Sequence, residues 1–254
     1  MEPNFKQGVG NLHQGDSLPS HDISRAQTLD ALLRGVTVDV ESVQALVRPL
    51  AEPYALVAMH PSCPVSHSGS RTRDDVHRGP SSRIAMVNDG DYDIALISNA
   101  DARRFAEEAL EKDKGPKLVG LSFSFSSTNA ISQQYKLLKY SLNAHGGEGL
   151  VEVKDYVLYY LRDEILENVD TRGLLHPALA KLARYDEANQ SSLLETLKVY
   201  LMYDRNAQRC ANTLYLHRNS LQYRVRRIQE IAGIDLENPD DRAYLRLSFF
   251  LSGM

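Results

Sequence analysis

Residues 206–228 read NAQRCANTLYLHRNSLQYRVRRI, and this stretch decides the fold of the C-terminal part of the chain. Residues 207–214 make about two helical turns, and the side chains on one face are small or apolar: Cys210, Ala211 and Leu214. Residues 215–217 are predicted to form a turn, with His217 at the N-cap position of a second helix. Because Ala211 is small, the second helix can cross the first at close range. The stretch therefore predicts a helix-turn-helix.

The second helix is predicted over residues 218–230, with two faces of different character. Leu221, Val225 and Ile228 recur at helical spacing and form its buried stripe. The opposite face carries side chains of the types that read base edges, since arginine pairs with guanine while asparagine and glutamine pair with adenine. A helix of this kind fits the major groove. The residues expected to contact DNA bases or phosphates are Arg209, Arg218, Asn219, Ser220, Gln222, Tyr223, Arg226 and Arg227.

Two side chains of the second helix have alternative interpretations. Tyr223 is either a core residue or a DNA contact, and its angular distance from Leu221 favours contact. Arg224 lies beside the buried stripe. It either braces the first helix or pairs with an acid such as Glu195 or Asp204.

The charge pattern supports a local anionic partner. The protein has a net charge of −4, yet residues 205–230 contain six arginines and one glutamate. Residues 1–204 are correspondingly acidic. A basic island in an acidic chain is typical of a nucleic-acid contact, and a solvated helix face is the alternative.

The composition is that of a globular protein. The chain has 254 residues, of which 43% are hydrophobic and 24% charged, and these values predict one large or two small domains. No apolar run approaches the roughly 20 residues that span a bilayer, and the N-terminus lacks a signal-peptide pattern. Cys63 and Cys210 are the two cysteines, which excludes a disulfide scaffold and fits a reducing compartment. We expect a cytoplasmic protein without a membrane partner.

The rest of the chain predicts an α+β fold followed by helices. We expect a flexible tail over residues 1–25, a helical segment over 26–53, an α+β domain over 54–153, a helical linker over 154–189 and the helix-turn-helix domain over 190–254. In the α+β domain the predicted strands cover residues 54–59, 83–87, 92–97, 117–122 and 150–153, and the predicted helices cover 102–112 and 128–144. Residues 60–82 are predicted to be a loop and 88–91 a hairpin turn. This order indicates an antiparallel-rich sheet covered by helices.

The final helix has a strong start signal at Asn238, an N-cap residue that is followed by proline and two acids. Its predicted buried side chains are Tyr244, Leu247, Phe250 and Leu251.

Residues 217–224, HRNSLQYR, resemble the signature of the C-terminal helix-turn-helix in the PucR/CdaR family of bacterial transcription regulators, which is similar to the Fis type. Residues 194–197 and 228–236 fit the frame of that family. Ser220 is a conservative departure from threonine, and Tyr215 replaces the glycine that Fis-type turns often carry. Gln222 falls at the variable position of the family and is a candidate for operator choice.

The resemblance also implies that residues 54–153 are a degenerate GGDEF-like α/β sandwich, as in the CdaR branch. A diguanylate cyclase needs a Gly-Gly-Asp/Glu-Glu-Phe hairpin and an acid on the first strand, whereas this hairpin reads DGDYD over residues 89–93 and His60 stands near the place of the acid. Without paired carboxylates two divalent ions have no ligands. We therefore interpret the domain as a non-catalytic scaffold or dimerisation unit and expect no catalytic residue, cofactor or metal. The set His60, Cys63, His67 and His77 matches no standard zinc spacing.

Together these features predict a regulator that binds double-stranded DNA as a homodimer, with half-sites about 34 Å apart or a multiple of that distance. A signal is expected to enter through a small-molecule effector or a partner protein, if at all. The alternatives are an interaction module that has lost DNA binding and a remnant of a nucleotide cyclase or phosphodiesterase.

Overall fold

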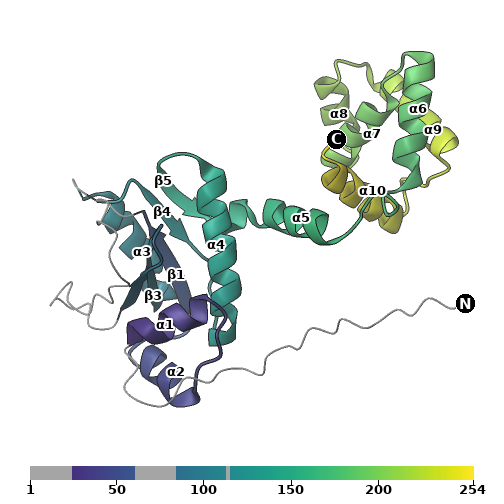
Figure 1. The fold of residues 1–254 in the computed structure, drawn as a ribbon. Helices are drawn as coiled ribbons and strands as arrows, with labels where there is room; N and C mark the ends of the chain where they lie inside the picture. The colour runs from purple at the N-terminus through teal and green to yellow at the C-terminus, as the bar shows by residue number, and fades with distance from the viewer. Residues whose placement is uncertain (1–24, 61–83, 113–114) are drawn as a thin grey trace, which may run out of the picture. The chain divides into compact units, whose positions relative to one another are not determined.

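The structure is a computed structural model that describes residues 25–60, 84–112 and 115–254 (Figure 1). Residues 1–24 of the predicted N-terminal tail lie outside the described residues, as do Cys63, His67 and His77. The chain divides into two compact units with the boundary between Tyr160 and Leu161. We call them the sheet unit and the helical unit. Within the described residues, no helix has the length and apolarity needed to cross a membrane.

The sheet unit contains the mixed α and β elements that the sequence predicted. Its elements are α1 (Arg25–Leu33), α2 (Val40–Val47), β1 (Tyr54–Met59), β2 (Ala85–Asn88), β3 (Asp93–Ser98), α3 (Asn99–Leu110), β4 (Leu118–Leu121), α4 (Ile131–His145) and β5 (Gly149–Glu152). The strand order is β2-β3-β1-β4-β5, and every pairing is antiparallel except that of β4 with β5. The prediction of an antiparallel-rich sheet is confirmed.

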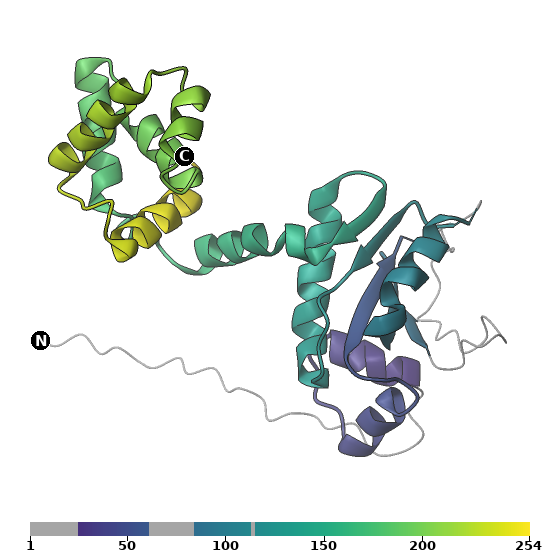
Figure 2. The ribbon, with the colours of Figure 1, turned by 180° about the vertical axis from the view of Figure 1, so that it is seen from behind.

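Helices cover both faces of this sheet (Figures 1 and 2). All six residues of β1 are buried. Tyr54, Leu56 and Ala58 pack in one core with side chains of α1, α2 and α4, whereas Ala55, Val57 and Met59 pack in a second core with the alanines of α3. Successive side chains of a strand point to opposite faces. A strand that is apolar on both faces therefore belongs at the centre of three layers.

The predicted hairpin turn connects β2 to β3, and α4 holds it in place. Asn88 pairs with Asp93, and the Asp89 carboxylate accepts hydrogen bonds from the backbone N–H groups of Asp91 at 2.9 Å and Tyr92 at 2.7 Å. The same carboxylate accepts hydrogen bonds from the Tyr135 hydroxyl and, at 3.1 Å, from the Lys139 ammonium group. The turn is thus part of a polar network that reaches α4.

The helical unit has a core of its own. It contains most of α5 (Val157–Asn168), then α6 (Pro177–Asn189), α7 (Leu193–Met202), α8 (Ala207–Thr213), α9 (Arg218–Ala232) and α10 (Pro239–Ser252). Leu182, Leu197, Ile228 and Leu245 are completely buried in this core. Because Leu182 belongs to α6, that helix forms part of the helical core in addition to joining α5 to α7.

The predicted buried face of α10 is wrong in part. Asn238 caps the helix as expected, and Leu251 is buried. Tyr244 and Leu247, however, are 41% and 49% exposed, and the buried residues at their level are Leu245, Ser248 and Phe249. The helix carries two adjacent apolar stripes at helical spacing. The sequence pattern does not distinguish them, and packing against α6 and α7 selects the one that contains Ser248.

Candidate nucleic-acid interface

Helices α8 and α9 pack against each other through small and apolar side chains. Cys210 and Ala211 of α8 are buried in one cluster with Leu221 of α9 and Val199 of α7. Burial raises the pKa of the Cys210 thiol, so this cysteine is a protonated core residue. The Asn206 side chain caps α8 by accepting a hydrogen bond from the backbone N–H of Arg209 at 3.1 Å. The predicted inner face of the first helix is confirmed.

The turn between the two helices requires a left-handed residue, and Tyr215 supplies it. Its φ is +53°, and its side chain is 96% exposed. A glycine adopts this conformation without strain, whereas a side chain at positive φ is unusual. The Leu216 N–H then bonds to the Ala211 carbonyl at 2.8 Å, which closes the turn. Tyr215 therefore stands at the position where the Fis-type glycine was expected.

The second helix begins at Arg218, as predicted. His217 has extended backbone angles, and its Nδ1 atom accepts a hydrogen bond from the Asn219 N–H at 3.3 Å. Histidine is not a favoured N-cap residue, yet here it satisfies a backbone donor that the helix itself leaves free. The predicted cap is confirmed.

The two faces of α9 differ as the sequence predicted. Leu221 and Ile228 are completely buried, and Val225 is partly buried against the same cores. Tyr223 is 63% exposed, which excludes its interpretation as a core residue. The structure leaves seven of the eight predicted contact residues exposed on α8 and α9: Arg209, Arg218, Asn219, Ser220, Gln222, Tyr223 and Arg226.

Arg227, the eighth predicted residue, is half-buried and bonded within the helical unit. Its guanidinium group lies 5.5 Å from the centroid of the Tyr185 ring and donates to the Tyr185 hydroxyl at 3.4 Å. It also pairs with Glu230 at 3.0 Å. These bonds to Tyr185 and Glu230 raise the pKa of Arg227 above its ordinary value. Arg227 is therefore held on the flank of α9 next to α6.

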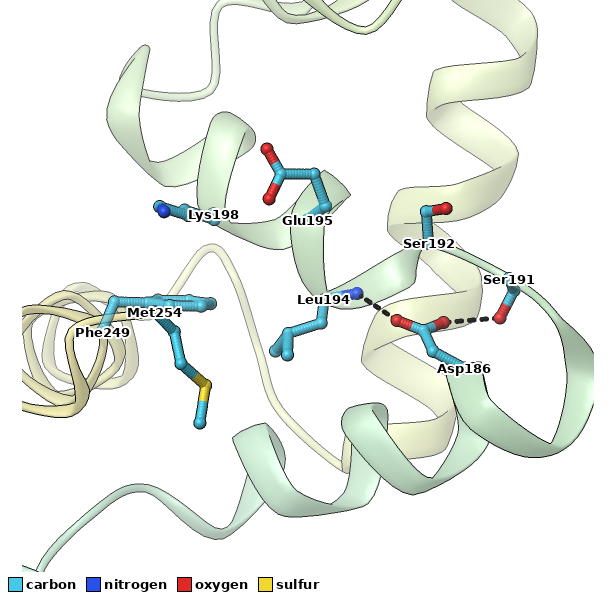
Figure 3. Close-up of a pocket in the computed structure, with 8 residues that line it drawn as sticks. All are labelled: Asp186, Ser191, Ser192, Leu194, Glu195, Lys198, Phe249 and Met254. Carbon is cyan, nitrogen blue, oxygen red and sulfur yellow. Dashed lines mark hydrogen bonds between the residues drawn. The ribbon is translucent and has the colours of Figure 1, made fainter.

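The expectations for Arg224 are wrong. Its Nη1 atom donates a hydrogen bond to the Thr196 hydroxyl of α7 at 3.2 Å. Asp204 is instead paired with Arg246. Thr196 is completely buried, so it faces the core side of α7 that α9 packs against. Glu195 is exposed and lines the pocket drawn in Figure 3. Sequence spacing alone gives no indication of this contact.

The corner between α6 and α7 is a feature that sequence reasoning missed. The Asp186 carboxylate accepts hydrogen bonds from the Ser191 hydroxyl and from the backbone N–H groups of Leu193 and Leu194, both at 2.8 Å (Figure 3). The carboxylate thereby caps the start of α7 from the preceding helix. An acidic residue shortly before an apolar helix is the one signal that pointed to this contact.

Charge on this surface is unevenly compensated. Arg205 pairs with Glu237, and Arg227 pairs with Glu230. Across the described ranges, no ion pair engages Arg209, Arg218, Arg224 or Arg226. Uncompensated arginines on and beside one exposed helix give the surface the positive potential that a polyanion requires.

The crossing of α8 and α9, the tight turn at Tyr215 and the polar outer face of α9 define a helix-turn-helix domain. Residues 193–250 match the family described as the PucR C-terminal helix-turn-helix domain. The predicted resemblance of the C-terminal helix-turn-helix to this family is therefore confirmed.

Three curated relatives are similar to parts of the chain. The DNA-binding transcriptional activator AdeR of Bacillus subtilis (strain 168) is 34% identical over 97 residues, 38% of this chain and 23% of the relative. The carbohydrate diacid regulator of Escherichia coli (strain K12) is 30% identical over 138 residues, 52% and 35% of the two chains. The proline-responsive transcriptional activator PutR of B. subtilis is 37% identical over 73 residues, 29% and 18%. This chain thus matches about a third or less of the length of each relative.

One solved structure, a regulator of polyketide synthase expression from Bifidobacterium adolescentis, is 20% identical and covers 91% of this chain and 97% of that one. Its TM-score is 0.42.

Proposed function

We propose that this protein is a sequence-specific, DNA-binding transcription regulator of the PucR/CdaR type that acts in the cytoplasm, with α9 inserted in the major groove. The observation that carries the proposal is the exposed polar face of α9, which lies opposite its buried face in a domain of the matched family. The names of the similar proteins describe transcriptional activators and a regulator. They support the same class for this chain.

Each exposed side chain has a distinct proposed role. Arg218, Asn219 and Gln222 read base edges, because the N-terminal residues of a recognition helix lie nearest the bases. Tyr223 and Arg226 extend this contact along the same face. Arg209, Ser220 and Arg227 bind phosphates and set the register without reading sequence.

The sheet unit is proposed to be a GGDEF-like scaffold without catalytic activity, which brings two chains together on paired half-sites. One observation supports a structural role for its hairpin. The Asp89 carboxylate bonds to Tyr135 and Lys139 and so is engaged within the fold. A homodimer would place two recognition helices on DNA of matching symmetry. A small-molecule effector or a partner protein would act through this unit.

The test is selection of bound sequences by the full chain from a random duplex pool, followed by a salt titration of the winner. We expect an enriched motif with two half-sites, and an affinity that falls steeply as salt rises. Salt-sensitive binding without enrichment would contradict sequence-specific readout. Absence of binding at any salt would favour an interaction module, and turnover of GTP with magnesium would favour an enzyme.

The role of Arg218 is tested by Arg218→Ala on the selected operator and on random DNA. We expect a loss of about 1–3 kcal/mol on the operator with little change on random DNA, if Arg218 reads a base. The matched control is Arg172→Ala, which removes another exposed arginine, one that pairs with Asp170. An equal loss on both duplexes would reassign Arg218 to a phosphate.

A further inference from the structure

A groove of about 460 Å³ runs along the flank of α9, beside its exposed face. The end of α6, the connection to α7 and the start of α7 form one wall, through Tyr185, Ser191 and Leu193. Successive turns of α9 form the other wall, through Asn219, Ser220, Arg224 and Arg227. Among its lining residues in the described chain none is acidic, and two are arginines. The groove therefore presents positive charge and hydroxyl groups to the same volume.

Arg224 provides the surplus charge of this groove. Among the described residues, its side chain makes one hydrogen bond, to the neutral Thr196 hydroxyl, and no ion pair. The residue is half-buried. Arg227 is different, because Glu230 compensates it. A partly buried guanidinium without an anionic partner has lost hydration that it does not regain inside the protein. An anion in the groove would supply the missing partner, and a guanidinium can bind a phosphate through two N–H groups.

The groove is preformed by contacts that need no ligand. Asp186 holds Ser191 and the first turn of α7 in place, and Thr196 holds Arg224. The Tyr185 ring supports Arg227. Two carboxylates lie near these groups, Glu230 on Arg227 and Asp186 on Ser191, and both are engaged in the bonds described. A site held in its binding geometry loses less conformational entropy when its ligand binds.

We propose that this groove seats a phosphate of the DNA backbone, with Arg224 as its charge partner and Ser220 as a hydrogen-bond donor. The inference rests on the proposed function and extends the DNA contact from α9 to the α6–α7 corner. The occupant is a DNA strand because Asn219 and Tyr223, which line the groove, also belong to the exposed face of α9. A strand that passes the groove would thus belong to the duplex whose bases α9 reads.

The test compares Arg224→Gln and Arg224→Lys with the native full chain on the selected operator and on random DNA. We expect Arg224→Gln to weaken both complexes by a similar factor, about tenfold, and to reduce the slope of log K against log salt by about 0.9. Arg224→Lys keeps the charge and should retain the slope. Arg172→Gln is the control for charge loss. Unchanged affinity and slope in Arg224→Gln would overturn the proposal.

A second measurement separates a phosphate contact from an effect on folding. The operator is synthesised with single neutral methylphosphonate linkages at successive positions. We expect one position in each half-site at which the neutral linkage weakens binding by the native protein. At that position the linkage should cause no further loss of affinity in Arg224→Gln, because the variant already lacks the contact. Equal losses in both proteins at every position would overturn the proposal. If the native protein binds no duplex at all, the proposed function fails instead. Binding of inorganic phosphate that Arg224→Gln abolishes, without such a position, would assign the groove to a free anion.

Discussion

The Tyr135 hydroxyl of α4 donates a hydrogen bond to the Asp89 carboxylate, which lies 46 residues earlier in the turn between β2 and β3. The hydrogen bond joins the β2–β3 turn to helix α4. Lys139 of α4 adds an ion pair to the same carboxylate at 3.1 Å. Burial, followed by the contact with Asp89, raises the pKa of Tyr135, so the hydroxyl remains a donor at neutral pH.

Tyr135→Phe should therefore loosen the hairpin. The variant keeps the ring and removes one hydrogen bond to a charged acceptor, which corresponds to about 1.5–3 kcal/mol of stability. Hydrogen exchange at the turn amides of Asp91 and Tyr92 measures the loss directly. Tyr159→Phe is the matched control, since Tyr159 is 55% exposed. Equal protection in the native chain and Tyr135→Phe would show that the turn does not depend on the Tyr135 hydroxyl.

Acid should weaken the same network. Burial by itself raises the pKa of Asp89, but the hydrogen bonds from Tyr135, Tyr92 and Lys139 outweigh it, so the pKa is lowered overall. A carboxylate whose pKa is lowered on folding stabilises the fold at pH values above its pKa in the unfolded chain, which is near 3.9. This contribution is lost as the pH falls through the pKa of the folded state. We expect the free energy of unfolding to fall below about pH 4. Asp89→Asn should show a smaller dependence on pH in the same acid titration.

Relief of the strain in the turn of the helix-turn-helix should stabilise the protein. Tyr215 has a φ of +53° and buries almost no surface. Tyr215→Gly relieves the strain, although glycine also gains freedom in the unfolded chain, so the net stabilisation should reach about 1 kcal/mol at most. Tyr215→Val should instead destabilise, because a β-branched residue tolerates positive φ poorly. Denaturant unfolding of the full chain ranks the three proteins, and a less stable Tyr215→Gly would contradict the strain.

Close packing of α4 on the sheet predicts a loss at Gly120. A Cβ atom at this position of β4 would lie 2.7 Å from Leu138 Cδ1 and 3.0 Å from Leu142 Cγ. Gly120→Ala should therefore cost about 1–3 kcal/mol through overpacking, measured by thermal or denaturant unfolding. Gly173→Ala is the control, because nothing lies within 4 Å of its added Cβ.

Local patterns predicted the elements and the inner faces of α8 and α9 because each depends on spacing within one segment. Helical spacing alone thus predicted correctly that Leu221 and Ile228 are buried and that Tyr223 is exposed. The pattern was insufficient on α10, where two apolar stripes compete and the neighbouring helices decide.

Side-chain contacts between different helices could not be predicted from the sequence. Arg224 bonds to Thr196, and Asp186 caps α7, because the fold brings α6, α7 and α9 together. Neither pairing follows from spacing along one element. The proposed roles of the exposed residues in DNA binding remain predictions, since they depend on a duplex that approaches this face.

The separate core of the helical unit has a consequence for how chains with this domain diversify. The family match, residues 193–250, falls wholly inside this unit. A unit with a complete core of its own keeps its fold when it is joined to a different neighbour. Gene fusion can thus exchange the unit joined to the helix-turn-helix domain while that domain is inherited intact.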